Sequence, residues 1–340
     1  MVQSARAPEF VRVAYRRSPE FVRVAYRHLH DLPTRIADER GRRRAAARRS
    51  GGLPFDAGAI QPLFIHPIEG RSGTTLMMKL LDVPEIAFDR VYPFENRYFD
   101  YLARMVTPMS APPDPEGARS TSGVLGGDPS GYAPIPFHAS SLDPADLRIR
   151  SVRHLWQALS ESLAGYSRTP LRYYAEKAWG NSLELLAEAG IKAKVINLVR
   201  DPRDVVSSIR AMDEKRGFFG FGRTDDMSED DYLQFVVAAM RHNLDAMSSA
   251  EAAHDCRLVR YEDIVRDPER VTRDLGSWLG VELGADRSVL AGPIFDRHAT
   301  SASAEQSIGK WKVRLTEREV TEITRVLGTS MQRFGYEASG

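Results

Sequence analysis

The residues with the clearest chemical meaning form one short turn, from Gly70 to Thr75. Glycine lets a backbone come close to a ligand, and hydroxyl groups donate hydrogen bonds to anionic oxygens. Arg71 adds a fixed positive charge, and the turn joins the apolar run 62–68 to the helix-like run 74–82. The hydroxyls belong to Ser72, Thr74 and Thr75. Because the free N–H groups at the start of a helix attract anions, the turn predicts a phosphate site.

The spacing of this turn differs from that of the loop that binds nucleoside triphosphates. That loop needs a glycine, four further residues, and then Gly-Lys followed by Ser or Thr. Here Gly70 and Gly73 are only three residues apart, and Thr74 stands where the lysine is required. The turn is therefore expected to hold phosphate without being the version that cleaves ATP.

A second pair of a basic and a hydroxyl residue lies further along the chain, at Arg200 and Ser208. Arg200 follows the apolar run 194–199, and ligands of open α/β sheets bind at the carboxyl ends of strands. At 100° per residue, Ser208 falls within the apolar stripe of the next helix, and burying an unsatisfied hydroxyl costs about 1–3 kcal/mol. The stripe comprises Val205, Ile209 and Met212. Two interpretations stay open: a second anion site, or a serine bonded to its own helix with Arg200 paired to Asp204.

The remaining composition points away from metal and membrane chemistry. Cys256 is the single cysteine, and His28 and His30 form the nearest pair of metal-ligand type, so we expect no metal. The longest apolar run, 235–240, is far shorter than the roughly 20 residues of a spanning helix, and no secretory signal segment is apparent. These features predict a cytoplasmic protein without a membrane span.

Alternating strands and helices must position the two anion-binding groups. Strands are expected at 62–68, 194–199 and 258–261, and helices at 74–82, 202–212, 231–252, 268–279 and 316–334. Asp201 and Pro202 mark a helix start, because aspartate caps helices and proline suits the first position, and Ser151 is expected to cap another helix. The alternation predicts a P-loop-like three-layer α/β fold, in which helices flank a central, mostly parallel sheet.

Two segments stand apart from this alternation. Residues 1–52 form a basic extension, with 13 arginines against five acids in the first 50 residues, and its segment 8–16 is repeated at 19–27. The extension is expected to be solvated, with at most weak contact to an anionic surface. Residues 53–340 are expected to form one domain, in which the proline- and glycine-rich stretch 107–148 is a long loop on the acceptor side.

Four blocks of the sequence resemble, in order, the successive blocks of the sulfotransferase family. They read FIHPIEGRSGTTLMMKLLD, VINLVRDPRDVVSSI, VRYEDIVRDPERVTRDLGSWLG and SIGKWKVRLTEREVTEI…RFGYE. The similarity covers about residues 60–337 and is greatest to the bacterial, tyrosylprotein-type branch. It implies an enzyme that moves the sulfuryl group of 3′-phosphoadenosine 5′-phosphosulfate (PAPS) to a hydroxyl or an amine, without a metal.

The resemblance also implies roles for individual residues. Residues 71–75 would hold the 5′-phosphosulfate, and Arg200 with Ser208 would hold the 3′-phosphate. Tyr261 would lie near the adenosine, although core packing is an equal alternative. The segment that closes over the cofactor contains Ser307 and Lys310.

A base must accept the proton of the acceptor, and the resemblance implies a glutamate shortly after the first helix. Glu95 is preferred, because residues 92–99 resemble the acid and the aromatic helix of the family. Asp89 and His66 are the alternatives. Lys177 aligns with a lysine of the family, but the residues after it depart from the family pattern.

Two other functions compete with sulfuryl transfer: a small-molecule kinase that uses ATP, and a non-catalytic nucleotide-binding protein. The acceptor is expected to be a hydroxylated small molecule or a glycan, and no nucleic acid is expected to bind. The sequence leaves the acceptor's identity and the oligomeric state open.

Overall fold

The computed structural model describes residues 60–90, 94, 97–106, 144–167, 169–178, 180–284 and 298–337. Its centre is a five-stranded sheet in the order β2-β3-β1-β4-β5, and all four strand pairings are parallel. The strands are β1 (Gln61–Pro67), β2 (Ile86–Ala87), β3 (Tyr173–Lys177), β4 (Lys194–Val199) and β5 (Asp255–Arg260). The predicted α/β class with a mostly parallel sheet is confirmed.

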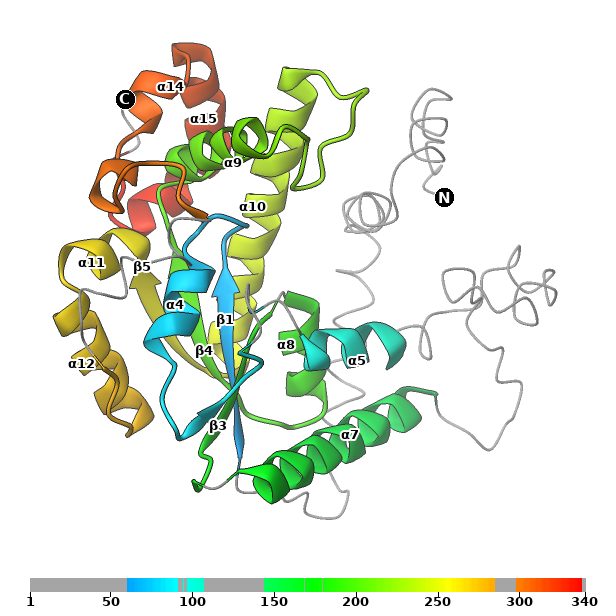
Figure 1. The fold of residues 1–340 in the computed structure, drawn as a ribbon. Coiled ribbons are helices and arrows are strands. Elements are labelled where there is room, and N and C mark those ends of the chain that lie inside the picture. The colour runs from blue at the N-terminus through cyan, green and yellow to red at the C-terminus, as the bar shows by residue number, and fades with distance from the viewer. Residues whose placement is uncertain are drawn as a thin grey trace, which may run out of the picture.

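Helices cover both faces of this sheet and make three layers (Figure 1). One face carries α4 (Thr74–Leu80), α11 (Tyr261–Arg266) and α12 (Pro268–Leu279). The other face carries α5 (Tyr98–Val106), α7 (Pro144–Tyr166), α8 (Gly180–Glu188), α9 (Pro202–Arg216), α10 (Glu229–Ala253) and α15 (Glu317–Arg333). The short η5 (Glu305–Ser307) and α14 (Trp311–Arg314) precede α15.

The alternation of side chains along β1 explains why both faces are covered. Leu63 and Ile65 pack toward α4 and α12, whereas Phe64 packs into the cluster that contains Trp156 of α7 and Tyr174 of β3. All of these side chains are buried. Burial on both faces of a strand such as β1 is typical of a parallel strand inside an α/β protein. The apolar run of β1 therefore fixes the position of the turn that follows it.

Helix signals in the sequence are realised close to their expected positions. The Asp201 side chain caps α9 by accepting the Arg203 N–H, and Pro202 is the first helical residue. Thr316 and Glu319 form a capping box at the start of α15, and Gly280 ends α12 in the left-handed conformation. Since β1 and β4 run in parallel, the segments after them emerge at the same edge of the sheet.

Other local expectations are wrong. Helix α7 begins at Pro144, so Ser151 lies within it and residues 144–148 belong to the helix rather than to the long loop. Proline at the first position and an acid in the first turn account for the earlier start. Tyr261 begins α11 rather than ending a strand.

Several predicted features lie outside the described residues. They are the extension 1–52 with its duplication, most of the loop 107–148, and Glu95. Within the described ranges, no helix is both long enough and apolar enough to cross a membrane.

Candidate active site

The turn 70–75, which we call the phosphate turn after the site predicted there, joins β1 to α4 at the carboxyl edge of the sheet. Arg71 and Gly73 both have positive φ angles, of 70° and 99°. The Ser72 side chain is fully buried, and its hydroxyl donates to the Glu69 carbonyl at 2.7 Å. Ser72 therefore stabilises the turn from inside, which leaves Arg71, Gly73 and the helix start facing outward.

Tyr261 packs directly against this turn. A Cβ atom at Gly73 would lie 2.5 Å from Tyr261 Cδ2, closer than real Cβ contacts come, so the turn needs glycine there for space as well as for its φ. The Arg200 guanidinium lies 4.3 Å from the centre of the Tyr261 ring. The Tyr261 hydroxyl is 3.0 Å from Ser307 Oγ, so the tyrosine connects the turn, β4 and the closing segment.

Arg200 is almost completely buried at the end of β4 and donates to two backbone carbonyls. Its Nη1 donates to the Arg71 carbonyl at 3.0 Å, and its Nη2 donates to the Ser307 carbonyl at 2.8 Å. Its Nε is buried without a hydrogen-bond partner among the described residues. A buried donor without a partner is costly, so the site has unused capacity to bind an acceptor of hydrogen bonds.

The two groups predicted to bind anions, the turn 70–75 and the pair Arg200 and Ser208, lie close together. Arg71 Nε donates to Ser208 Oγ at 3.2 Å, because the long arginine side chain reaches from the turn to α9. Ser208 Oγ is also 3.2 Å from Thr300 Oγ1, and Arg71 contacts His298. The groups therefore face one shared pocket.

The segment that contains Ser307 and Lys310, predicted to close over the cofactor, is held in place by an acid of α9. The Asp204 carboxylate accepts the backbone N–H groups of Gly309 and Trp311, at 2.6 and 3.0 Å. Lys310, between them, donates through Nζ to the Thr300 carbonyl at 2.7 Å. Asp204 is thus occupied with this segment and is not hydrogen-bonded to Arg200 in the structure.

These groups surround a cavity of about 320 Å³, within the range of small-molecule sites. Its lining includes most of the residues that the sequence assigns to a cofactor: Arg71, Gly73, Thr74, Thr75, Arg200, Ser208, Tyr261 and Ser307. Ser72 and Lys310 support this lining from behind. The pocket also gains Lys79, His298 and Phe221, which sequence reasoning missed because no motif marks them.

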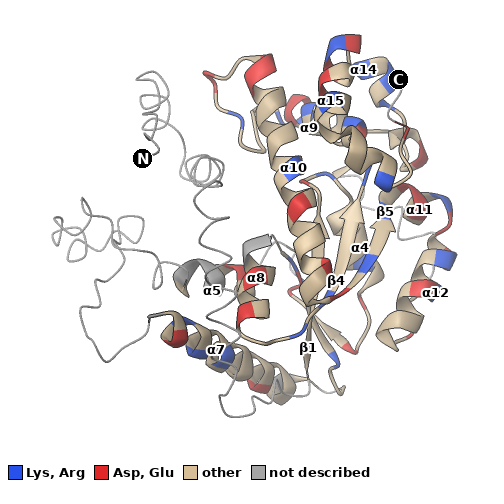
Figure 2. Ribbon diagram, turned by 180° about the vertical axis from the view of Figure 1, so that it is seen from behind, with Lys and Arg blue, Asp and Glu red and all other residues tan. Residues whose placement is uncertain are grey.

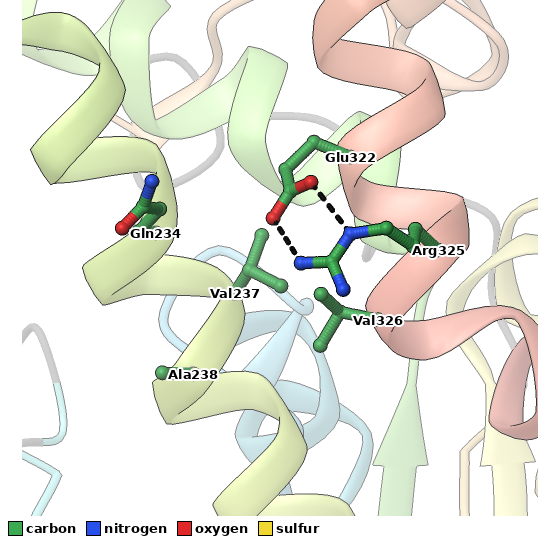
Figure 3. Close-up of a pocket in the computed structure, with 6 residues that line it drawn as sticks. All are labelled: Gln234, Val237, Ala238, Glu322, Arg325 and Val326. Carbon is green, nitrogen blue, oxygen red and sulfur yellow. Dashed lines mark hydrogen bonds and ion pairs between the residues drawn. The ribbon is translucent and has the colours of Figure 1, made fainter.

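A second cavity, of about 290 Å³, lies between α10 and α15 (Figure 3). Its lining residues are Gln234, Val237, Ala238, Glu322, Arg325 and Val326. Glu322 and Arg325 satisfy each other through two hydrogen bonds, of 2.7 and 2.8 Å. No residue of the phosphate turn or of the strand ends borders this cavity, and its chemistry suggests no reaction.

The candidate bases are placed very differently. His66 is fully buried on the α10 face of β1, and its ring nitrogens have no hydrogen-bond partner among the described residues. Burial, with His242 nearby, lowers the pKa of His66 to about 4. Asp89 is partly buried and does not border the pocket, and Glu95 lies outside the described residues. The position of His66 disfavours it as a base.

Lys177 is brought to the site by β3. Its Nζ lies 3.4 Å from Thr75 Oγ1, and the residue is almost fully buried. The register pairs Lys177 with Ile65 of β1, which places it beside the phosphate turn. The structure therefore supports a role for Lys177 at the turn, although the residues after it depart from the family pattern.

Glu69, next to the turn, makes the stability of the folded protein depend on pH. Burial raises the pKa of Glu69 from 4.5 to about 7, although its carboxylate accepts the Gly70 N–H. The native state therefore holds more protons than the unfolded state between these values, and stability falls as the pH rises through this window. We expect Glu69→Gln to stabilise the protein by roughly 1–3 kcal/mol at pH 8, and to have little effect near pH 4.5.

Urea unfolding of both proteins at the two pH values measures this difference. The glutamine can still accept the Gly70 N–H, so the variant isolates the charge. An equal effect at both pH values would show that the ionisation of Glu69 is not the cause.

Comparison with known proteins agrees with this geometry. The family model described as "Sulfotransferase family" matches residues 62–285, more than half of the chain. Carbohydrate sulfotransferase 5 of Mus musculus is 25% identical over 177 residues, which cover 45% of this chain and 44% of the mouse protein. The chain thus spans less than half the length of that relative.

Two solved structures are similar at low identity. A sulfotransferase from Alicyclobacillus acidocaldarius is 15% identical, with a TM-score of 0.44, over 81% of this chain and 94% of that chain. A mouse sulfotransferase complexed with PAP is 11% identical, with a TM-score of 0.42, over 83% and 88%. The family match spans the phosphate turn, Arg200, Ser208 and Tyr261, the same residues that meet around the pocket. This chain belongs to the sulfotransferase family.

Proposed function

We propose that this protein transfers the sulfuryl group of PAPS to a hydroxyl of a small-molecule or glycan acceptor. The observation that carries the proposal is the shared pocket, where the phosphate turn, Arg200 and Ser208 meet in a chain of this family. The buried, unpartnered Nε of Arg200 and the hydroxyls of the lining fit a ligand rich in anionic oxygens.

Different residues of the pocket would bind different parts of such a nucleotide. The turn, with Arg71, would hold the 5′-phosphosulfate, and Arg200 and Ser208 would hold the 3′-phosphate. Arg71 would then exchange its contacts with Ser208 and His298 for phosphate oxygens. Tyr261 presents its ring beside Gly73 and borders the pocket, where it would lie near the adenosine.

The reaction needs positioning and charge stabilisation more than covalent help from the protein. The acceptor oxygen forms a bond to sulfur while the bond from sulfur to the 5′-phosphate oxygen breaks, and the nucleotide leaves as adenosine 3′,5′-bisphosphate (PAP). By analogy with phosphoryl transfer, the transition state is loose and in line. Arg71, Lys177 and the turn amides would stabilise the negative charge that grows on the phosphate, and Glu95 would accept the acceptor's proton.

Calorimetry with PAP and with ADP tests the nucleotide specificity. We expect PAP to bind more tightly, because ADP has no 3′-phosphate for Arg200 and Ser208. Equal binding would instead favour an ATP-using kinase.

Transfer of ³⁵S from labelled PAPS to a panel of hydroxylated sugars, peptides and phenols then identifies the acceptor class. A protein that binds PAP without any transfer would be a non-catalytic nucleotide-binding protein.

Arg200→Ala should weaken PAP binding by about 10–150-fold, or roughly 1.5–3 kcal/mol. Arg200 offers a charged donor to the 3′-phosphate and also ties the Arg71 and Ser307 carbonyls together. Calorimetry measures the loss, and Arg257→Ala, an exposed arginine on β5, is the control that should leave binding unchanged. An unaltered dissociation constant in Arg200→Ala would remove Arg200 from the binding site.

A further inference from the structure

The connection between α9 and α10, residues 217–228, contributes to the pocket and exposes aromatic side chains. In Figure 1 and, from behind, in Figure 2, this connection lies at the same end of the molecule as the carboxyl ends of the strands. Phe218 and Phe219 are exposed, whereas Phe221 lines the pocket. Neighbouring exposed apolar side chains beside a pocket mark a surface that binds a ligand.

Phe221 is held against the phosphate turn in a strained conformation. Its φ angle is 49°, in the left-handed region that residues other than glycine rarely adopt. A Cβ atom at Gly70 would lie 3.0 Å from two atoms of the Phe221 ring, so this ring rests on the first residue of the turn. Such strain persists only where the surrounding structure enforces it, and it is concentrated at functional sites. A ligand that packs on Phe221 would therefore lie next to the turn.

Arg216, the last residue of α9, lines the same pocket. Its guanidinium lies 5.6 Å from the centre of the Phe221 ring and 6.0 Å from that of Phe218. No acid of the described residues forms an ion pair with Arg216, whereas Arg223 of the same connection pairs with Glu229. A basic residue suits the end of a helix, but this alone does not explain why the side chain turns toward the pocket.

The acids closest to Arg216 in the sequence have other partners. Asp213 is almost fully buried, and its carboxylate accepts the Gly220 N–H at 2.9 Å, which shapes the connection. Its interaction with Arg216 acts over a longer distance than an ion pair. Glu214 pairs with Arg314 at 3.1 Å. The charge of Arg216 therefore remains uncompensated by a direct carboxylate contact from these residues.

The described lining of the pocket contains positive charge and no acid. Its basic side chains belong to Arg71, Lys79, Arg200 and Arg216. Burial lowers the pKa of His298 to about 4, and the positive charges around this histidine, that of Arg216 among them, lower it further. A pocket with such a positive potential favours ligands that carry negative charge.

The contacts proposed for the nucleotide use only part of this charge. They involve the phosphate turn, Arg200 and Ser208, and none of them involves Arg216. Arg216 is exposed, so its charge lies at the mouth of the pocket, where a second ligand can reach it. Its guanidinium can form two parallel hydrogen bonds with a carboxylate, which would fix the orientation of that ligand.

We propose that Arg216 and Phe221 form the acceptor subsite, and that the acceptor carries a negative charge: its anionic group pairs with Arg216 while an apolar ring face packs on Phe221. This inference rests on the proposed function and narrows its acceptor. The anionic group can belong to a phenol or to a sugar, since both present an apolar ring face.

Transfer from ³⁵S-PAPS to acceptors that differ only in charge tests the subsite. The phenols are 4-hydroxyphenylacetate, its amide and tyramine, and the sugars are glucuronate and glucuronamide. We expect kcat/KM to be about 5–30-fold higher for a carboxylate than for its amide, and lowest for tyramine among the phenols. The series that accepts label distinguishes a phenolic from a sugar acceptor.

Substitutions of Arg216 separate a charge contact from a structural role. Arg216→Gln should reduce the preference for the carboxylate to less than about twofold, and Arg216→Glu should make tyramine a better acceptor than 4-hydroxyphenylacetate. The dissociation constant of PAP should change by less than about twofold in both variants. Both should fold, because Arg216 is exposed. Arg318→Gln, an exposed arginine of α15 outside the pocket lining, is the matched control and should keep the preference.

Phe221→Leu tests the apolar half of the subsite. Loss of the ring face should raise the KM of the preferred acceptor by about 3–10-fold and change kcat by less than about twofold. An unchanged KM would remove Phe221 from the subsite.

Three results would overturn the inference and leave the proposed function intact. They are equal use of a carboxylate and its amide, transfer only to uncharged or cationic acceptors, and a carboxylate preference that survives Arg216→Gln. A parallel loss of PAP affinity in Arg216→Gln would assign Arg216 to the nucleotide and would also overturn it. A wild-type protein that neither binds PAP nor transfers label would overturn the proposed function, and this inference with it.

Discussion

Replacing Arg71 with glycine is expected to lower turnover by about 10²–10³-fold without unfolding the protein. The loss would follow from removing the charge that we propose to face the departing phosphate. Arg71 has a φ of 70°, which side chains other than glycine adopt at a cost of roughly 1–3 kcal/mol. Relief of that strain should offset the lost hydrogen bonds to Ser208 and His298, so the stability should change by no more than about 1 kcal/mol.

Steady-state kinetics and thermal unfolding of the same preparation separate the two effects. Arg71→Lys is the comparison, because it keeps the positive charge and loses the planar guanidinium group with its paired N–H donors. Its turnover should be intermediate. If Arg71→Gly turns over at the wild-type rate, the charge at this position is not part of catalysis.

The second large effect is expected at Glu95. Glu95→Gln should lower kcat by about 10²–10⁴-fold, because glutamine cannot accept the proton that the acceptor must lose. PAP binding should stay within about twofold of the wild type, since described residues that line the shared pocket supply the contacts proposed for the nucleotide. Transfer rates from ³⁵S-PAPS and calorimetry with PAP give the two quantities.

Asp89→Asn decides between the two acids. Asp89 is partly buried and lies outside the pocket lining, so its substitution should cost little activity. A collapse of turnover in Asp89→Asn, together with an active Glu95→Gln, would reverse the assignment. His66→Gln is a poor test of the same question, because this fully buried side chain sits in the core on the other face of β1.

The parts of the fold that the sequence predicts well are those with strong local signals. The apolar run 62–68 and the glycine-containing turn after it predict β1 and the turn into α4, and Asp201 with Pro202 predicts the start of α9. These features depend on backbone conformation and capping within a few residues, which a sequence pattern records directly. The placement of Arg200 at the end of β4 follows from the same pattern.

Features that depend on contacts between distant segments were not predictable in the same way. Strand β3 ends in Glu176 and Lys177, and charged residues are rarely buried without partners, so its pattern does not favour a strand. Their partners lie about a hundred residues away in the phosphate turn and 76–77 residues away in α5. The approach of Arg71 to Ser208 likewise depends on the path of one long side chain.

The close approach of Tyr261 to Gly73 limits how the nucleotide preference of this protein can be engineered. The same tyrosine lies against Arg200 and hydrogen-bonds Ser307. A smaller or larger residue at 261, introduced to admit a different base, would also disturb the turn and the arginine that we propose to hold the phosphates of the nucleotide. Redesign toward a cheaper sulfate donor should therefore vary these four positions together, in one combinatorial library, rather than one at a time.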